Sequence, residues 1–210
     1  PRFTRHFTML ALPQPDDENM RTIFGSILGG FLKEGFATDQ QMMCAGIVSA
    51  SVEMYRRICA ELLPTPSKSH YTFNLRDTAK VVQGMLMVRS NSVTTKQALA
   101  RLWVHEASRV FSDRMTNNED KEYFNGMVTE LVGRHLGGVL THDELFGEGV
   151  HNFFGDYMKM GAEGNDRVYE EITDVQKMLK VFDDYLDEHN LSSKSPMNLV
   201  FFMDAVGHIT

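Results

Sequence analysis

Apolar side chains recur every three or four residues along most of this chain, and that spacing is the strongest constraint on its fold. Phe24, Ile27 and Leu28 follow one another in this way, directly after Asp16 and Asp17, which suit a helix N-cap and an acidic first turn. The same pattern resumes after each group of proline, glycine or polar residues. It predicts helices over about 17–32, 39–63, 74–86, 96–115, 119–136, 166–188 and 196–209. The sequence therefore predicts a mainly α fold.

Three stretches do not follow the helical spacing. His6–Leu12 is a short apolar run with β-like character that proline closes. The stretch 64–70, PTPSKSH, predicts a short linker stiffened by two prolines. Residues 142–161 are rich in glycine and aromatic residues, which predicts a loop with a brief extended piece near 153–158.

Composition excludes several classes of function. Hydrophobic residues make up 42% of the 210 residues and charged residues 23%, which is typical of a globular protein. The net charge of −7 argues against a nucleic-acid partner. No apolar run approaches the length of about 20 residues that a membrane span needs, so no membrane partner is expected. The fourteen methionines are interpreted as adaptable core residues, although a methionine-rich binding groove is the alternative.

The two cysteines, Cys44 and Cys59, lie in one predicted helix. Fifteen residues of helix separate two positions by about 22 Å, far more than a disulfide can bridge. We expect both to be reduced, buried thiols of an intracellular protein. Because no closely spaced cysteine pair occurs, no metal site is expected.

The segment 68–84, KSHYTFNLRDTAKVVQG, contains the clearest candidate binding residue. Asn74 and Asp77 predict a capping box, so Arg76 lies in the first turn of an amphipathic helix whose apolar stripe is Leu75, Ala79, Val82 and Leu86. An arginine beside the free N–H groups of a helix start can reach a phosphate. The local sequence alone favours a plainer interpretation, in which Arg76 is a surface residue that pairs with Asp77 or a neighbour.

No residue predicts catalysis. The chain lacks both the G-x-x-x-x-G-K-[ST] phosphate loop and an apolar strand ending in paired acids, so it should not hydrolyse ATP by itself. His105 and Glu106 begin an H-E-x-x-H pattern that Arg109 breaks. We therefore expect His105 on the helix surface, Glu106 paired with Arg109, and a surface ion network continuing through Asp113 and Arg114.

An acidic cluster occurs on the helix predicted over 166–188. Spacings of three and four residues bring some of its carboxylates to one face, where calcium could bind, but no D-x-D-x-D-G loop accompanies them. A solvated charged face is the favoured interpretation. The cluster consists of Asp183, Asp184, Asp187 and Glu188.

The segments 68–84 and 101–114 (RLWVHEASRVFSDR) resemble, in order and spacing, the helical lid of the third AAA+ module of an axonemal dynein heavy chain. PRFTRHF and LLPTPSKSHYTFNLRD resemble the end of that module's large subdomain and the start of its lid. YEEITDVQKMLKVFDDYL and PMNLVFFMDAVGHI resemble the entry to the fourth module. The resemblance implies the end of an α/β large subdomain at 1–66, a helical lid at 67–145, and a linker with the first helices of the next module at 146–210.

The resemblance also implies roles for arginines. Arg76 matches the sensor arginine of AAA+ lids, and Arg5, with Arg2 as the alternative, matches the arginine finger that reaches nucleotide in the adjacent module. The implied parent is an ATP-driven, minus-end-directed microtubule motor of cilia and flagella, located in the cytoplasm, the cytoskeleton and the axoneme. ATP or ADP with Mg would be held by other parts of the parent, with no nucleotide bound tightly to this segment alone.

The implied partners are neighbouring AAA+ modules, intermediate and light chains, and the microtubule through distant parts. Two other functions stay open from the residues: a free-standing helical adaptor that binds a partner helix, and a small intracellular enzyme. The last predicted helix reaches Thr210 without a cap, and Pro1 is not methionine, so we expect a piece of a longer polypeptide.

Overall fold

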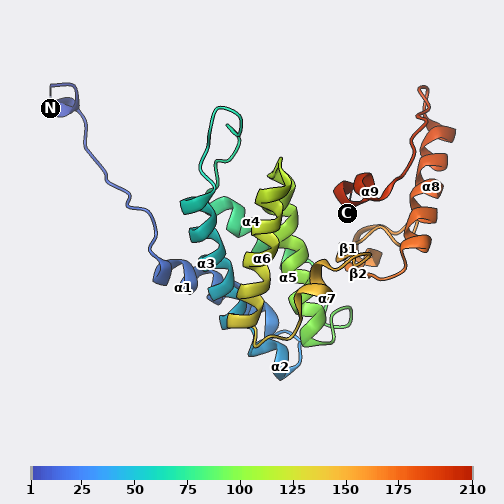
Figure 1. Ribbon diagram of the computed structural model, residues 1–210, viewed down its shortest axis with the longest axis horizontal. Helices are drawn as coiled ribbons and strands as arrows, with labels where there is room; N and C mark the ends of the chain where they lie inside the picture. Colours follow the sequence, from blue (N-terminus) through green and yellow to red (C-terminus); the bar gives the residue numbers. More distant parts are fainter. Residues whose placement is uncertain (1, 210) are drawn as a thin grey trace.

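The computed structural model describes residues 2–209, without the side chain of Asn165. Pro1 and Thr210, on which the expectation of a longer polypeptide rests, lie outside the described residues. The chain is mainly helical, which confirms the predicted fold class (Figure 1). Its longer helices are α1 (Asp17–Leu32), α3 (Cys44–Glu61), α4 (Leu75–Met85), α5 (Lys96–Val110), α6 (Asn118–His135) and α8 (Val175–Ser192). The shorter helices are η1 (Thr4–His6), α2 (Thr38–Gln41), η2 (Ser112–Arg114), α7 (His142–Phe146), η3 (Gly164–Asp166) and α9 (Met203–Ile209).

Helices α1 to α7 pack around one hydrophobic core, and we call residues 17–146 the helical body. Trp103 of α5 is fully buried at its centre and donates a hydrogen bond from Nε1 to Ser51 Oγ of α3, at 2.9 Å. Asp16 caps α1 by accepting from Asn19 N at 2.7 Å. Half of the fourteen methionines are buried core residues. They are Met20, Met43, Met54, Met85, Met115, Met127 and Met178.

The helices of the body differ from the prediction in their breaks. The helix predicted over 39–63 is interrupted after α2, and the one predicted over 96–115 ends at Val110 and continues as η2. Helix α7 lies in a stretch predicted as loop, and Thr141 and Glu144 form its capping box. Ala79, assigned to the apolar stripe of α4, is exposed, because Val81 and Met85 face the core instead.

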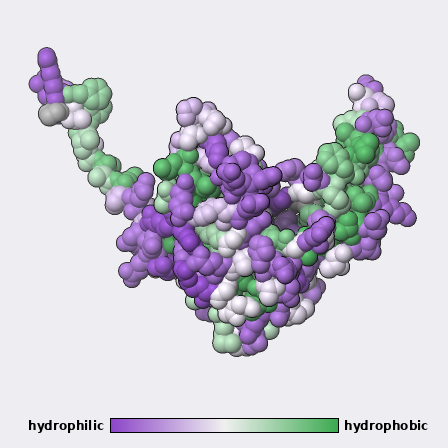
Figure 2. Space-filling model, in the orientation of Figure 1, coloured by the Kyte–Doolittle hydropathy of each residue, from purple (hydrophilic) through white to green (hydrophobic). Residues whose placement is uncertain are grey.

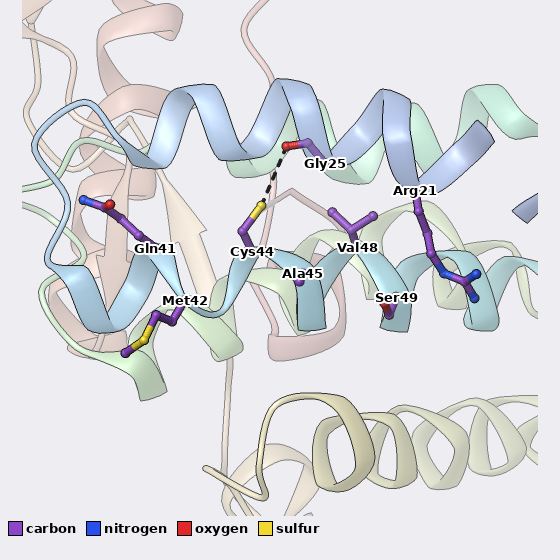
Figure 3. A pocket seen from close by; sticks show the side chains of 8 residues that line it. All are labelled: Arg21, Gly25, Gln41, Met42, Cys44, Ala45, Val48 and Ser49. Carbon is purple, nitrogen blue, oxygen red and sulfur yellow. Dashed lines mark hydrogen bonds between the residues drawn. The ribbon is translucent and has the colours of Figure 1, made fainter. Parts of the chain in front are cut away.

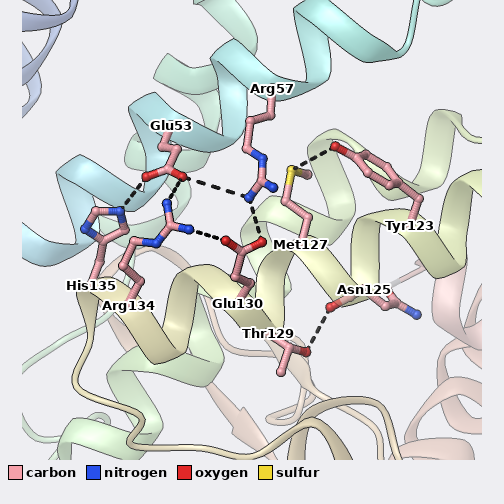
Figure 4. A network of polar contacts seen from close by, with 9 residues as sticks. All are labelled: Glu53, Arg57, Tyr123, Asn125, Met127, Thr129, Glu130, Arg134 and His135. Carbon is pink, nitrogen blue, oxygen red and sulfur yellow. Dashed lines mark hydrogen bonds and ion pairs between the residues drawn. The ribbon is translucent and has the colours of Figure 1, made fainter.

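A network of charged side chains joins α3 to α6 (Figure 4). Glu53 of α3 accepts from Arg134 and from His135 Nε2, at 2.7 Å, while Arg57 reaches Glu130 at 2.9 Å. The hydrogen bond from His135 holds the pKa of Glu53 below its ordinary value. Exposed ion pairs contribute little stability each, so this network mainly fixes how the two helices lie against each other.

The predicted β-like run His6–Leu12 does not form a strand. Its residues lie in η1 and in an exposed extended segment that leads away from the helical body (Figure 1). A strand needs a neighbour to satisfy its N–H and C=O groups, and the sheet found among the described residues pairs β1 with β2 only.

Residues 147–209 form a C-terminal arm. Strand β1 (Phe153–Gly155) pairs antiparallel with β2 (Glu170–Ile172), with Phe154 opposite Glu171. The extended piece predicted near 153–158 is therefore confirmed at β1. The prediction of a helix from residue 166 was wrong about where the helix starts, because residues 170–172 form a strand. Helix α8 begins only at Val175, and Asp174 caps it by accepting from Lys177 N.

The last predicted helix was also wrong at its start. Pro196 lies in an irregular stretch, and α9 begins at Met203. The arm has a small core of its own, made by Phe153, Ile172, Met178, Phe182 and Val206. Among residues 2–209, no helix has the length and apolar character to cross a bilayer.

Candidate functional site

The start of α4 has the capping box that the sequence predicts. Asn74 Oδ1 accepts from Arg76 N at 2.9 Å, and Asp77 Oδ2 accepts from Asn74 N at 2.9 Å. The backbone N–H of Arg76 is thus already bonded. If a phosphate bound beside this turn, the guanidinium of Arg76 would be the group of this residue that reaches it.

Asp77 is buried, and its carboxylate bonds to residues other than the Arg76 side chain. Its Oδ1 accepts from Arg114 Nη2 at the end of η2, and the Arg114 guanidinium also lies over the Phe73 ring, 5.4 Å from its centre. Arg114 was expected in a surface ion network, and that expectation is corrected, since its partner is a carboxylate with only 5% of its side chain exposed. The plainer interpretation of Arg76, a pair with Asp77, is not what the structure shows.

The segment just before α4 is fixed to the start of α6. Asp120 Oδ2 accepts from Lys68 Nζ at 2.5 Å and from the Tyr71 hydroxyl at 2.7 Å, and Thr116 N donates to the same hydroxyl. His70 is bonded through Nε2 to the carbonyl oxygen of Arg114 at 2.8 Å. These contacts hold the residues before α4 in place, so the position of its first turn is well determined.

Arg76 itself is exposed, and its side chain forms no ion pair with any other residue in the described range 2–209. It therefore lies neither in a closed apolar interior nor in an internal salt bridge. A cavity of about 200 Å³ opens beside this turn, between α3, the start of α1 and the start of α4, but Arg76 is not among the residues that line it. The lining residues are Gln14, Pro15, Met20, Tyr55, Arg56, Phe73, Asn74 and Leu75.

The N-terminal segment that carries the candidate arginine finger lies far from α4 in Figure 1. Arg5 is exposed in η1, and its Nε donates to His6 Nε2 at 2.9 Å; Arg2 is also exposed. The structure thus does not bring Arg5 or Arg2 together with Arg76. An arginine finger acts on a neighbouring module, so this separation does not test the predicted role.

His105 is the residue whose position differs most from the prediction. It is only 3% exposed, where a surface position was expected, and its Nδ1 lies 2.7 Å from the carbonyl oxygen of Asn152. Burial lowers the pKa of His105 to about 4. Its ring also lies 5.4 Å from that of Phe154 in β1, a contact that the α5 sequence alone does not reveal.

Glu106 is also buried, and the expected pair with Arg109 is replaced by a contact with the arm. Tyr169 donates its hydroxyl to Glu106 Oε1 at 2.7 Å, and burial raises the pKa of Glu106. Arg109 pairs instead with Asp113, at 3.1 Å. One turn earlier on α5, Arg101 forms two bonds with Glu171 of β2, at 2.5 and 3.1 Å. The polar residues of α5 therefore hold the arm, which was not predicted.

A shallow groove of about 470 Å³ lies between α1 and α3 (Figure 3). Cys44 points across it toward the carbonyl oxygen of Gly25, and both Cys44 and Cys59 are free and half-buried rather than fully buried as expected. Met42 is the only methionine among its described lining residues, so this groove is not the methionine-rich surface that a helix-binding adaptor would offer.

The acidic residues Asp183, Asp184, Asp187 and Glu188 are exposed on α8, as a solvated charged face requires. In the described part of the chain, no three His, Cys, Asp or Glu side chains are gathered so that they could hold a metal.

Comparison with known proteins identifies relatives of the helical body and of the whole chain. The family described as "AAA+ lid domain" matches residues 47–146, which run from α3 to α7. Human "Dynein axonemal heavy chain 6" is 43% identical over the whole chain, and rat "Dynein axonemal heavy chain 12" and human "Dynein axonemal heavy chain 3" are each 38% identical. By sequence, the chain is related to a segment of the axonemal dynein heavy chains. It spans only 5–7% of the length of these curated relatives.

The dynein resemblance seen in the sequence is thereby confirmed, and the helical body contains the segment that matches the AAA+ lid domain family. The placement in a third module and the boundaries near 66 and 145 stay predictions.

Proposed function

We propose that this chain is the lid-bearing segment of an axonemal dynein heavy chain, at the junction of its third and fourth AAA+ modules. In this proposal the parent is an ATP-driven, minus-end-directed microtubule motor of the axoneme. The segment supplies the lid and the contacts between modules that gate the motor's response to nucleotide. It has no catalytic activity of its own, because its sequence lacks a phosphate loop and a metal-holding strand.

The main observation in support is the arrangement around Arg76. Its neighbour Asp77 is fully used by Asn74 and Arg114, and its backbone N–H is capped, yet its guanidinium is exposed and forms no ion pair within residues 2–209. A charged donor that projects from a rigid helix start is suited to contact a phosphate held by another part of the polypeptide.

Such a contact would couple the position of the lid to the nucleotide state. A lid position in which Arg76 touches the γ-phosphate is favoured while ATP is bound and loses that contact after hydrolysis. The nucleotide and its Mg would be held by residues outside this chain. Arg5, with Arg2 as the alternative, would act on the nucleotide of the adjacent module.

The other partners follow from the proposed parent. They are the neighbouring AAA+ modules, the intermediate and light chains, and the microtubule, which distant parts of the heavy chain would bind. The relation to heavy chains along the whole sequence favours this proposal over a free-standing adaptor or a small enzyme.

The test is Arg76→Ala in the intact heavy chain. A charged hydrogen bond contributes about 1.5–3 kcal/mol, so the nucleotide affinity of this module should fall by about 10- to 100-fold. The rate at which the motor releases from microtubules should then depend much less on the nucleotide bound at this module. Release can be followed by stopped-flow light scattering at several nucleotide concentrations.

The matched control is Lys80→Ala, which removes an exposed cation one turn further along α4. It should leave the nucleotide response unchanged, and Arg76→Lys should retain part of it. An Arg76→Ala motor with a normal nucleotide dependence of microtubule release would disprove the proposed role.

A further inference from the structure

A second cavity, of about 250 Å³, lies on the opposite side of α5 from the main core contacts. It is open to solvent on one side and lined by residues of α5, α6, the end of α7, the segment that leads into β1, and Phe153 of β1. Six polar residues contribute to its lining: His105, Ser108, Arg109, Asn125, His151 and Asn152. Neither Arg76 nor Arg5 contributes to it, so this cavity is separate from the proposed nucleotide response.

His105 lines this cavity and has an unpartnered acceptor. Its Nδ1 lies 2.7 Å from the Asn152 carbonyl oxygen, which can only accept, so Nδ1 carries the proton. Because burial holds the pKa of His105 near 4, the ring is neutral around pH 7 and Nε2 has a free lone pair. This Nε2 is inaccessible to solvent and makes no hydrogen bond with any residue from 2 to 209.

Arg109 also lines this cavity and has unpartnered donors. Its Nη2 is bonded to Asp113, but Nε and Nη1 are inaccessible to solvent and find no acceptor among the described residues. Asn152 donates from Nδ2 to the Leu145 carbonyl at 2.7 Å, and its Oδ1 is likewise without a partner in that range. Buried polar atoms almost always have a partner, so four such atoms on three residues that line one cavity favour a bound ligand.

The charges around the cavity favour an anion. Arg109 is cationic, and no carboxylate is among the described residues that line the cavity, although the whole chain carries a charge of −7. An adjoining cavity shares Arg109 and His151 and adds Lys121 and His208, together with Asp113 and Asp204. The two donors of Arg109 require acceptor oxygens, whereas His105 Nε2 and Asn152 Oδ1 require a donor.

We propose that this cavity binds inorganic hydrogen phosphate. Its charged oxygens accept from Nε and Nη1 of Arg109, and its P–OH group donates to His105 Nε2 or Asn152 Oδ1. Sulfate and carboxylates carry no proton at neutral pH and would leave both acceptors unpaired, whereas the P–OH group pairs with one of them. A phosphate monoester is mainly dianionic at pH 7, so it also lacks the proton that would be donated to these acceptors. This inference does not depend on the proposed lid function.

The first test needs no variant. The whole chain is titrated with inorganic phosphate at pH 7 and constant ionic strength, and binding is followed by the midpoint of thermal unfolding and by ³¹P line broadening. Sulfate and a simple phosphate monoester are titrated in parallel. We expect saturable binding of phosphate and an affinity at least about tenfold weaker for the other two anions. Equal responses to phosphate and sulfate, or no saturable response, would overturn the proposal.

Two variants locate the site. Arg109→Gln removes the cation, and Asn125→Asp places a negative charge on the lining with almost no change in shape. Each should weaken phosphate binding by at least about tenfold. Lys96→Ala is the control, because Lys96 lies at the other end of α5 and pairs with the exposed Asp39. If Arg109→Gln fails to fold, Asn125→Asp still decides the question. Unchanged phosphate binding in Asn125→Asp would refute the location.

Discussion

The helical body and the C-terminal arm differ in how completely they bury their apolar side chains. The body surrounds one continuous core that includes Trp103, Phe111 and Phe124, all fully buried. The arm has five core residues, and it leaves apolar side chains exposed between α8 and α9, visible as the green surface of the arm in Figure 2. These are Met197, Leu199, Val200 and Phe202. The body can thus be stable through its own packing, whereas the arm depends much more on the contacts that join it to the body.

Those contacts combine Phe154, which is fully buried in the core of the body, with polar contacts that converge on α5. Tyr169 bonds to Glu106, Glu171 bonds to Arg101, and the carbonyl oxygen of Asn152 accepts from His105. A parallel bridge between Val88 and Tyr169 adds a backbone contact. Hydrogen bonds of this kind are directional, so they set the angle of the arm more than they add to overall stability.

The largest expected effect is on the body. Trp103→Ala leaves a large cavity in the core and removes the indole donor to Ser51, whose hydroxyl still donates to the Ile47 carbonyl oxygen. It should lower the free energy of unfolding by about 3–5 kcal/mol. Phe202→Ala removes a large apolar side chain of the arm that is 60% exposed. It should change the free energy of unfolding by less than about 0.5 kcal/mol. Urea unfolding followed by circular dichroism measures both. Similar losses in the two variants would remove the distinction between body and arm.

An intermediate effect is expected from acid at the joint between the two regions. The folded pKa of His105 is about 4, below its ordinary value of 6.5, so the folded state resists protonation. Stability from this residue is complete above about pH 6.5 and is lost as the pH falls toward 4, by on the order of 3 kcal/mol. Urea unfolding at a series of pH values measures the loss.

His105→Gln removes the titrating group and should flatten this part of the pH profile. Glu106 acts in the opposite direction, because its folded pKa is raised: its contribution to stability is complete below pH 4.5 and is lost as the pH rises through the raised value. The Glu106→Gln variant separates the two contributions. A His105→Gln protein whose stability still falls equally steeply between pH 6.5 and 4 would contradict the assignment to His105.

The parts of the fold that were predicted correctly depend on neighbouring residues in the sequence. The bounds of α1 follow from Asp16 and the spacing of Phe24 and Leu28, and the start of α4 follows from Asn74 and Asp77. Caps and periodic apolar faces involve residues within one or two turns, so the sequence displays them directly. The same local signal identified Arg76 at the second position of α4.

The errors arose where a distant segment decides the structure. His105 shares a face with Arg101 and was assigned to the surface, but β1 and its preceding loop, about 47 residues further on, cover it. Residues 170–172 were assigned to a helix from apolar spacing alone, and their pairing with β1 overrides that preference. A capping signal at Asp174 was present in the sequence and could have placed the start of α8 correctly.

The smallest expected effect distinguishes the two regions most sharply. Tyr169→Phe keeps the ring but removes the hydroxyl that donates to Glu106, leaving a buried carboxylate without this partner. The cost is about 1–3 kcal/mol, and because the bond joins arm to body, it should appear mainly as local opening of the arm. Amide hydrogen exchange should therefore speed up at residues 167–182, while α3 and α6 in the body stay protected. Tyr185→Phe is the control, since Tyr185 lies on α8 and its hydroxyl bonds to no residue in the described range. If exchange accelerated equally in body and arm, the two would be one cooperative unit, and the arm could not be positioned independently by the polar residues of α5.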